Sequence, residues 1–128
     1  AGVEYENFVN LPSGDVVIQY EKCDLVAFAS LYEGFGLPIL EAQAVGRAVL
    51  TSNRSPMSDV AGEGACLIDP EDTKAIRAGI ERIVDDAGYR NHLIERGFEN
   101  IKRFQPKQIA ERYLALYEKI LADANGAP

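Results

Sequence analysis

Hydrophobic and polar positions follow two different periods along the chain. The first half carries short apolar runs separated by helical segments and breaker residues, and each run predicts a strand. The predicted strands are residues 3–9, 25–29, 48–51 and 65–68. Helical periodicity predicts helices over 15–22, 38–45, 72–84, 87–102 and 107–123, with a short helical turn at 59–61. Strands that alternate with helices indicate an α/β fold in which helices cover both faces of a parallel sheet.

The predicted sheet has about four strands, whereas doubly wound sheets usually have five or six. The first residue is Ala1 rather than Met. We therefore expect the first strands of the sheet to precede this chain, which leaves a truncated sheet with an exposed edge. Such an edge makes self-association possible. Residues 1–124 are predicted to form one partial domain, and residues 125–128 a frayed tail.

Composition narrows the class of protein. The chain has 128 residues, of which 47% are hydrophobic and 26% charged, as in ordinary globular domains. Its formal net charge of −7 disfavours nucleic-acid binding. Cys23 and Cys66 each lie beside apolar runs, which predicts buried thiols in a reducing, cytoplasmic compartment. The single histidine, His92, supplies a zinc site poorly, and no metal is expected.

The segment 30–37 has the composition of a ligand-binding loop. It follows the predicted strand 25–29, and ligands of parallel α/β sheets bind at the carboxyl ends of strands. Gly34 and Gly36 allow the backbone to turn sharply and to approach a ligand closely. The helix predicted from Pro38 points its N–H groups at the same space, which favours a phosphate or diphosphate.

Two carboxylates, Glu33 and Glu41, flank this predicted helix start with seven residues between them. A carboxylate can accept hydrogen bonds from two adjacent hydroxyls of a sugar or a ribose. Together with an anion-binding helix start, the pair describes a nucleotide-sugar site. The residues alone leave another interpretation open, in which one carboxylate only favours the helix dipole and the other is a solvated surface group.

Residues 33–42, Glu-Gly-Phe-Gly-Leu-Pro-Ile-Leu-Glu-Ala, resemble the Glu-x7-Glu signature of retaining glycosyltransferases with the GT-B fold, and more narrowly family 4 of these enzymes. The resemblance extends through residues 20–30 and 46–52 and covers about residues 3–121. It implies a Rossmann-like, donor-binding C-terminal half of a GT-B enzyme. The N-terminal acceptor domain, a partner of this half, then lies outside the chain.

The resemblance also implies roles for individual residues. Glu33 is the expected catalytic residue, which contacts the transferred sugar, and Glu41 is expected to hold the ribose hydroxyls. Backbone N–H groups toward the sugar and diphosphate are expected from Gly34, Phe35, Gly36 and Leu37. The implied donor is a nucleoside diphosphate hexose of the GDP-mannose or UDP-glucose type, used without cofactor or metal in bacterial cell-surface polysaccharide biosynthesis. The isolated chain is expected to be inactive.

Other classes of protein compete with this interpretation. A non-catalytic nucleotide-sugar-binding or interaction module, or a folding or design fragment of such an enzyme, fits the same fold. A nucleotide-sugar epimerase or a phosphorylase is disfavoured by the Glu-Gly-Phe-Gly-Leu-Pro run. Arg47 and Arg54 are predicted to be surface residues rather than diphosphate ligands. The full-length enzyme is expected to be cytoplasmic or peripheral to the inner membrane.

Overall fold

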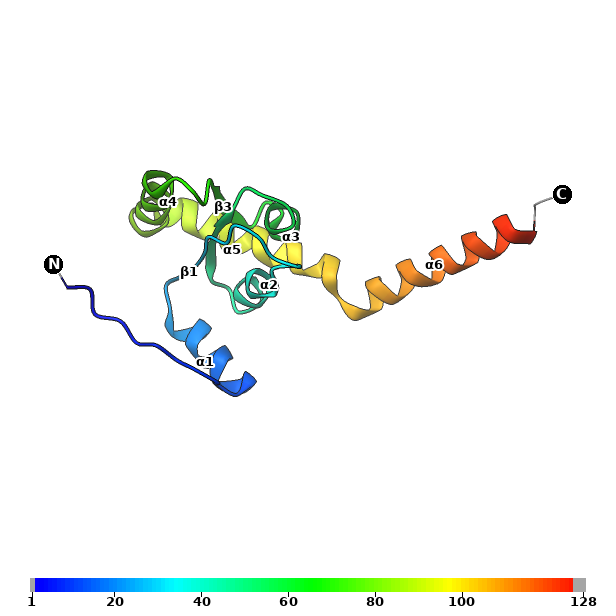
Figure 1. Ribbon diagram of the computed structural model, residues 1–128, viewed down its shortest axis with the longest axis horizontal. Coiled ribbons are helices and arrows are strands. Elements are labelled where there is room, and N and C mark those ends of the chain that lie inside the picture. The colour runs from blue at the N-terminus through cyan, green and yellow to red at the C-terminus, as the bar shows by residue number, and fades with distance from the viewer. Residues whose placement is uncertain (1, 126–128) are drawn as a thin grey trace.

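The computed structural model describes residues 2–125, in which helices and short strands alternate before a helical C-terminal part (Figure 1). The elements are α1 (Ser13–Lys22), β1 (Leu25–Phe28), α2 (Leu37–Ala44), β2 (Ala48–Ser52), α3 (Met57–Ala61), β3 (Ala65–Ile68), α4 (Thr73–Asp85), α5 (Ala87–Ile101), the 3-10 helix η1 (Lys102–Phe104) and α6 (Pro106–Asn125). Every predicted helix is present, with ends that differ by a few residues. The predicted left-handed stop after α2 is also confirmed, because Gly46 has a φ of 71°.

The sheet is parallel, in the order β1-β2-β3. Leu25 lies opposite Ala48 in the first pair of strands, and Val49 lies opposite Ala65 in the second. Helices α2 and α3 make the two crossovers. The strand in the middle, β2, is buried along its whole length, as an unbroken apolar run in a parallel sheet requires. The predicted parallel α/β fold is therefore confirmed.

Alternate residues of β2 enter separate cores on the two faces of the sheet. Val49 packs with residues of α2 and α3, among them Ile39 and Val60. Ala48 and Leu50 pack on the other face with residues of α4 and α5, the innermost being Ile83 and Leu93. Burial of one such aliphatic side chain contributes about 1.5–3 kcal/mol to folding. Helices on both faces thus hold β2, and with it the loops at its carboxyl end.

The strand predicted at residues 3–9 is wrong for this chain. Within the described part of the sequence these residues belong to no helix or strand, and the segment runs apart from the sheet (Figure 1). Their side chains are exposed, Tyr5 to 85%. An alternating pattern becomes a strand only where another strand accepts its backbone hydrogen bonds, and among residues 2–125 none lies beside this segment. The sheet of the described residues has three strands instead of the predicted four.

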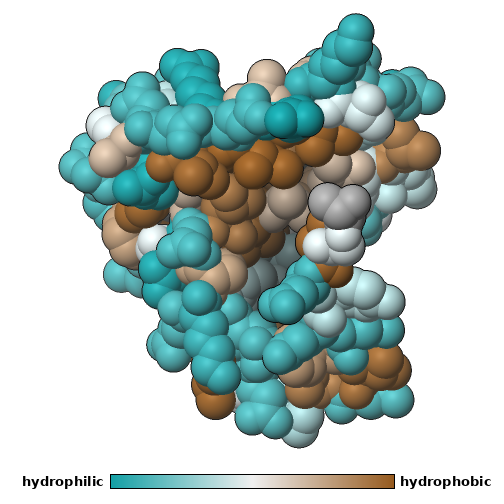
Figure 2. All heavy atoms as spheres, turned by 90° about the vertical axis from the view of Figure 1, so that its left-hand side faces the viewer, coloured by the Kyte–Doolittle hydropathy of each residue, from teal (hydrophilic) through white to brown (hydrophobic). Residues whose placement is uncertain are grey.

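One edge of the sheet and the last helix leave apolar groups exposed. No strand among residues 2–125 pairs with the outer edge of β1, the edge that faces away from β2. Apolar side chains gather in a hollow on the face that Figure 2 shows. Helix α6 extends away from the sheet (Figure 1). It exposes six large apolar side chains: Tyr113, Leu114, Leu116, Tyr117, Ile120 and Leu121. Apart from Asn125, which ends α6, the predicted frayed tail at 125–128 lies outside the described residues.

The two cysteines are free thiols, but only Cys66 is buried as predicted. Cys23 is half-buried, and its Sγ donates to the Tyr20 carbonyl oxygen at 3.2 Å. This bond lies at the end of α1, where the last carbonyls of a helix need donors. Cys23 therefore contributes to the helix end as well as to packing.

Candidate functional site

Loops that follow the strands meet at one end of the parallel sheet, and the loop between β1 and α2 supplies the candidate site. Gly36, the N-cap of α2, has a φ of 96° and is buried. A Cβ at this position would lie 3.2 Å from Cδ1 of Ile39. Glycine is therefore required both by the left-handed backbone and by the close approach of the helix. The turn directs the backbone into α2 at the predicted place.

Gly34 differs from Gly36 in its surroundings. It is exposed, and a Cβ built on it would meet no atom of the described structure within 4 Å. The outer side of the loop is therefore open space that a ligand could approach. The N-terminus of α2 begins immediately afterwards, with Pro38 in its first turn. Helix starts favour anions in general, and binding of a phosphate or diphosphate at this one stays a prediction.

Glu33 is held within the loop by a hydroxyl group. Ser30 Oγ donates to Glu33 Oε1 at 2.8 Å, and the glutamate side chain is half-buried. The bond closes a short ring between the end of β1 and the loop. It restricts the carboxylate without neutralising its charge, because the donor is neutral.

Glu41 lies one turn inside α2 and is also held by a hydroxyl. The Tyr20 hydroxyl of α1 donates to Glu41 Oε2 at 2.9 Å. Burial, and then the hydrogen bond to Glu41, raises the pKa of Tyr20 to about 12, so the phenol stays protonated and remains a donor. A cleft of about 310 Å³ between α1 and α2 is lined by Tyr20, Glu41 and apolar side chains such as Val16 and Val45.

Phe35 and Leu37 present apolar side chains on the same loop. Phe35 is 46% exposed and Leu37 55% exposed. The ring of Phe35 meets the ring of Phe104 edge to face, with centroids 5.9 Å apart. The loop thereby contacts η1, which leads into α6. The structure places all six predicted site residues on one continuous loop and helix start, the segment 33–41.

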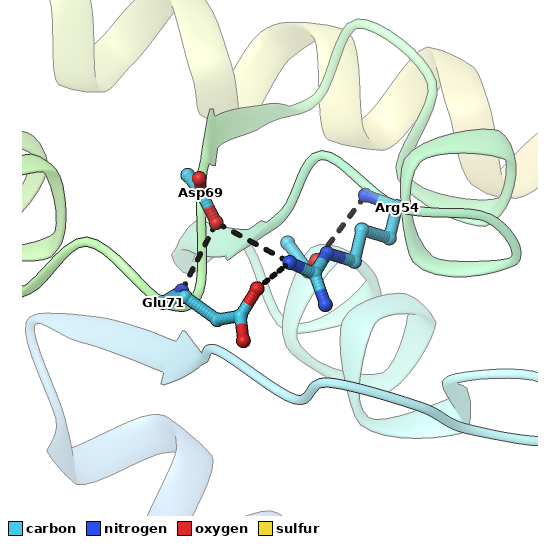
Figure 3. A network of polar contacts seen from close by, with 4 residues as sticks. Arg54, Asp69 and Glu71 are labelled. Atoms are coloured by element: carbon cyan, nitrogen blue, oxygen red, sulfur yellow. Dashed lines mark hydrogen bonds and ion pairs between the residues drawn. The ribbon is translucent and has the colours of Figure 1, made fainter.

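The loops after β2 and β3 are closed by charge pairing instead (Figure 3). Arg54 donates to a carboxylate oxygen of Glu71, and its Nη2 lies 3.6 Å from Asp69 Oδ1. The backbone N–H of Glu71 also donates to Asp69 at 3.0 Å. Arg54 is partly exposed, as predicted, and its guanidinium already has acidic partners.

Comparison with known proteins decides the family. The family model described as "Glycosyl transferases group 1" matches residues 3–100. The chain belongs to this family. Membership of a glycosyltransferase family, as predicted, is thereby confirmed. The narrower assignment to retaining enzymes of family 4 stays a prediction.

Relatives of this group 1 chain include enzymes that act on sugars. It is 32% identical to O-antigen chain mannosyltransferase B of Escherichia coli over 116 residues, which are 91% of this chain and 30% of that protein. It is 31% identical to MMP alpha-(1->4)-mannosyltransferase of Mycolicibacterium hassiacum over 105 residues, 79% of this chain and 26% of that protein. The chain thus spans less than a third of the length of these curated relatives.

A solved structure shares the fold of this group 1 chain. Sucrose-phosphate synthase from Thermosynechococcus elongatus superposes with a TM-score of 0.76 at 27% identity. The likeness covers 91% of this chain and 30% of that one.

No helix among the described residues is long and apolar enough to cross a membrane.

Two polar groups near the site differ from what the sequence indicates. Arg47, predicted at the surface, is half-buried and donates from Nε to the Tyr20 carbonyl at 3.0 Å and from Nη2 to the Glu21 carbonyl at 2.5 Å. It therefore caps α1 and is no free cation for a diphosphate. Tyr20 packs its ring against the core, and its hydroxyl also holds Glu41, a contact that the sequence does not reveal.

A buried network of side-chain amides behind α2 was not predicted from the sequence. Gln43 is 1% exposed, and its Nε2 donates to the carbonyls of Ala61 and Gly64. Its Oε1 accepts from Asn100 Nδ2 at 2.8 Å. The network fixes α2 against α3 and α5, and so keeps the helix that carries Glu41 in place. The sequence signal that could have indicated this network was a glutamine flanked by alanines in an otherwise apolar helix.

Metal binding finds no support in side-chain geometry. Over residues 2–125, His, Cys, Asp and Glu side chains form no group of three or more able to hold a metal ion. The expectation that catalysis needs no metal stays a prediction.

Proposed function

We propose that the chain is the donor-binding, C-terminal half of a retaining GT-B glycosyltransferase of family 4. The observation that carries this proposal is the pair Glu33 and Glu41, each held by a neutral hydroxyl donor on either side of the Gly36 turn. Asp69 and Glu71, by contrast, share the positive charge of Arg54. Carboxylates oriented by hydroxyls retain acceptor oxygens and charge for a polyhydroxyl ligand.

The proposed donor is a nucleoside diphosphate hexose. Glu41 holds the ribose hydroxyls, and Glu33 holds hydroxyls of the transferred sugar near the reacting carbon. Backbone N–H groups of residues 34–37 and the positive end of α2 receive the diphosphate. GDP-mannose and UDP-glucose are the donor types first considered, and the two mannosyltransferase relatives support a mannose donor.

The proposed reaction breaks the bond between the sugar's anomeric carbon and the diphosphate oxygen. The acceptor hydroxyl oxygen forms the new glycosidic bond on the same face, and its proton passes to the departing phosphate. The helix start stabilises the negative charge that develops on the leaving group, which is electrostatic catalysis. No metal takes part in this scheme, and the acceptor is bound by a domain outside the chain. The product would enter cell-surface polysaccharide, as the O-antigen relative's name supports.

The isolated chain is proposed to bind donor weakly and to turn nothing over. Calorimetric titration with GDP-mannose, UDP-glucose, GDP and UDP tests the binding, and the Glu41→Ala variant tests the site. Loss of a hydrogen-bonded acceptor is expected to weaken binding by about 1–3 kcal/mol. Glu118→Ala on α6 is the matched control, because this exposed glutamate lies on a helix far from the loop. Equal affinities of wild type and Glu41→Ala would contradict the assignment.

The competing function is a non-catalytic module that binds nucleotide sugar. An assay of sugar transfer by a full-length enzyme that contains this chain distinguishes the catalytic function from the non-catalytic one. Sugar transfer that Glu33→Ala abolishes supports the enzyme, whereas unchanged donor binding without transfer supports the module.

We also propose that the exposed edge of β1 allows two copies to associate. Ala27 of this strand is exposed, and among residues 2–125 no strand covers the outer edge of β1. Sedimentation velocity over a concentration series should reveal a dimer that Ala27→Lys abolishes, because a charged side chain on an edge opposes pairing. Identical sedimentation of both proteins would contradict this proposal.

A cytoplasmic location, at the inner membrane surface in a full-length enzyme, completes the proposal. The free thiols of Cys23 and Cys66 support a reducing compartment. Fractionation of cells that express the full-length protein tests it.

A further inference from the structure

The hydroxyl of Tyr20 reaches Glu41 from a different helix. Tyr20 stands near the end of α1, 21 residues before Glu41, and the two oxygens are 2.9 Å apart. The bond crosses the cleft between α1 and α2, where both residues contribute to the lining. Glu41 is half-buried, so this contact is made in a partly desolvated setting. The carboxylate therefore has a fixed partner before any ligand arrives.

Tyr20 itself is held at its backbone and at its ring. Its carbonyl oxygen accepts hydrogen bonds from Arg47 Nε at 3.0 Å and from Cys23 Sγ at 3.2 Å. Its ring packs against the core on the α2 and α3 face of the sheet. Arg47 begins the segment that leads into β2, so the carbonyl of Tyr20 is tied to the sheet. A donor held in this way fixes the position of the group that it bonds.

We propose that Tyr20 is a positioning residue for Glu41: its hydroxyl occupies Oε2 and directs Oε1 toward the hydroxyls of the bound ligand. The inference rests on the proposed function, in which those hydroxyls belong to a ribose. A free glutamate side chain samples several rotamers, and ordering it on binding costs affinity. Tyr20 removes part of that cost in the unbound protein. Its raised pKa, about 12, keeps the phenol a donor throughout the neutral range.

The test compares nucleotides that have or lack the ribose hydroxyls. GDP and UDP, and their 2′,3′-dideoxy forms, are titrated into the wild-type chain and into Tyr20→Phe. Removal of one hydrogen bond is expected to weaken binding of the ribonucleotide about five-fold. The dideoxy nucleotide has nothing for Oε1 to bind, so its affinity is expected to stay the same. Equal weakening of both nucleotides would make Tyr20 a merely structural residue and overturn the proposal.

Tyr89 offers a matched control for the loss of a hydroxyl. It is half-buried and packs on the opposite face of the sheet, and burial raises its pKa to about 12 as well. Tyr89→Phe is expected to leave the affinity for both kinds of nucleotide unchanged. A loss equal to that of Tyr20→Phe would show a general effect of the substitution and contradict the proposal.

A double-mutant cycle shows whether Tyr20 acts through Glu41. In the Glu41→Ala background, Tyr20→Phe is expected to have no further effect on GDP or UDP affinity. A second five-fold loss in that background would overturn the proposal.

A measurement without ligand separates this proposal from the proposed function. The ring carbon bonded to the Tyr20 hydroxyl is followed by NMR from neutral to alkaline pH. Glu41→Ala is expected to lower the pKa of Tyr20, because the acceptor and its negative charge are gone. An unchanged pKa would mean that the hydrogen bond does not form in solution and would overturn the positioning role alone. A folded wild-type chain that binds neither nucleotide would overturn the proposed function and the positioning role together.

Discussion

Two groups of acidic residues lie at the carboxyl end of the same sheet and are stabilised in opposite ways. After β1, Glu33 and Glu41 accept from the hydroxyls of Ser30 and Tyr20. After β3, Asp69 and Glu71 pair with Arg54, which comes from the loop after β2. A neutral hydroxyl donor orients a carboxylate without offsetting its negative charge. A guanidinium cation offsets part of that charge by ion pairing within the protein. This contrast supports the proposed ligand site in the β1–α2 loop.

The largest effect is expected at the turn that brings the two glutamates to one helix start. Gly36→Ala places a Cβ on a backbone with a φ of 96° and against Ile39. Strain and crowding should lower the free energy of unfolding by about 3 kcal/mol. Urea denaturation measures the loss. Gly34→Ala, at a position with open space, is the control and should change stability by less than about 1 kcal/mol. Equal losses for both variants would remove the special status of the Gly36 turn.

Glu33 and Glu41 should be separable by the part of the donor that each holds. Glu33→Ala is expected to weaken binding of a nucleotide sugar by about 2 kcal/mol and to leave the affinity for free GDP or UDP unchanged. Glu41→Ala is expected to weaken both. Titration calorimetry with each pair of ligands checks this split. If Glu33→Ala weakened the free nucleotide as much as the nucleotide sugar, the separate roles would be wrong.

Alkaline pH should reveal the hydroxyl that holds Glu41. Burial raises the pKa of Tyr20 and of Tyr89 from 10.0 to about 12, and the bond to Glu41 adds to the shift of Tyr20. Between these values the unfolded chain has lost phenolic protons that the folded chain keeps, so stability falls as pH rises from about 10 to 12. Urea unfolding at several pH values should show a shallower fall for Tyr20→Phe. If the free energy of unfolding fell equally steeply with pH in wild type and in Tyr20→Phe, the pKa of Tyr20 would not be raised in the folded protein, which would contradict the prediction.

The smallest effect is expected where charge pairing closes the neighbouring loops. Arg54 is partly exposed and its ion pairs lie at the surface, so Arg54→Ala should hardly move the midpoint of urea unfolding. Nucleotide-sugar affinity should stay at the wild-type value. A marked loss of affinity would place Arg54 in the ligand site and erase the contrast between the two groups of acidic residues.

Local pattern predicted much of this arrangement. The apolar run of β2, the Gly36 turn and the position of Glu41 on the following helix all depend on nearby residues, and the structure confirms them. Residues 3–9 have an equally clear alternating pattern, yet they form no strand in the described structure, because a strand also needs a neighbour. Sequence patterns describe a segment and not its partner.

Long-range polar contacts were the part that could not be predicted. Tyr20 bonds Glu41 across 21 positions, and Asn100 bonds Gln43 across 57. Neither pair has a periodic signal, because each depends on which helices become neighbours. Both pairs fix α2, so the features that the sequence did not reveal are those that hold the candidate site in shape.

Nucleotide binding at the start of α2 is tested most directly by backbone NMR. The ¹H–¹⁵N spectrum of the chain is followed while GDP or UDP is added. If the nucleotide binds there, the largest shifts fall on the amides of residues 34–37 and on their neighbours in α2. Saturable shifts confined to the loops of Arg54 and Asp69, or none at millimolar nucleotide, would contradict it.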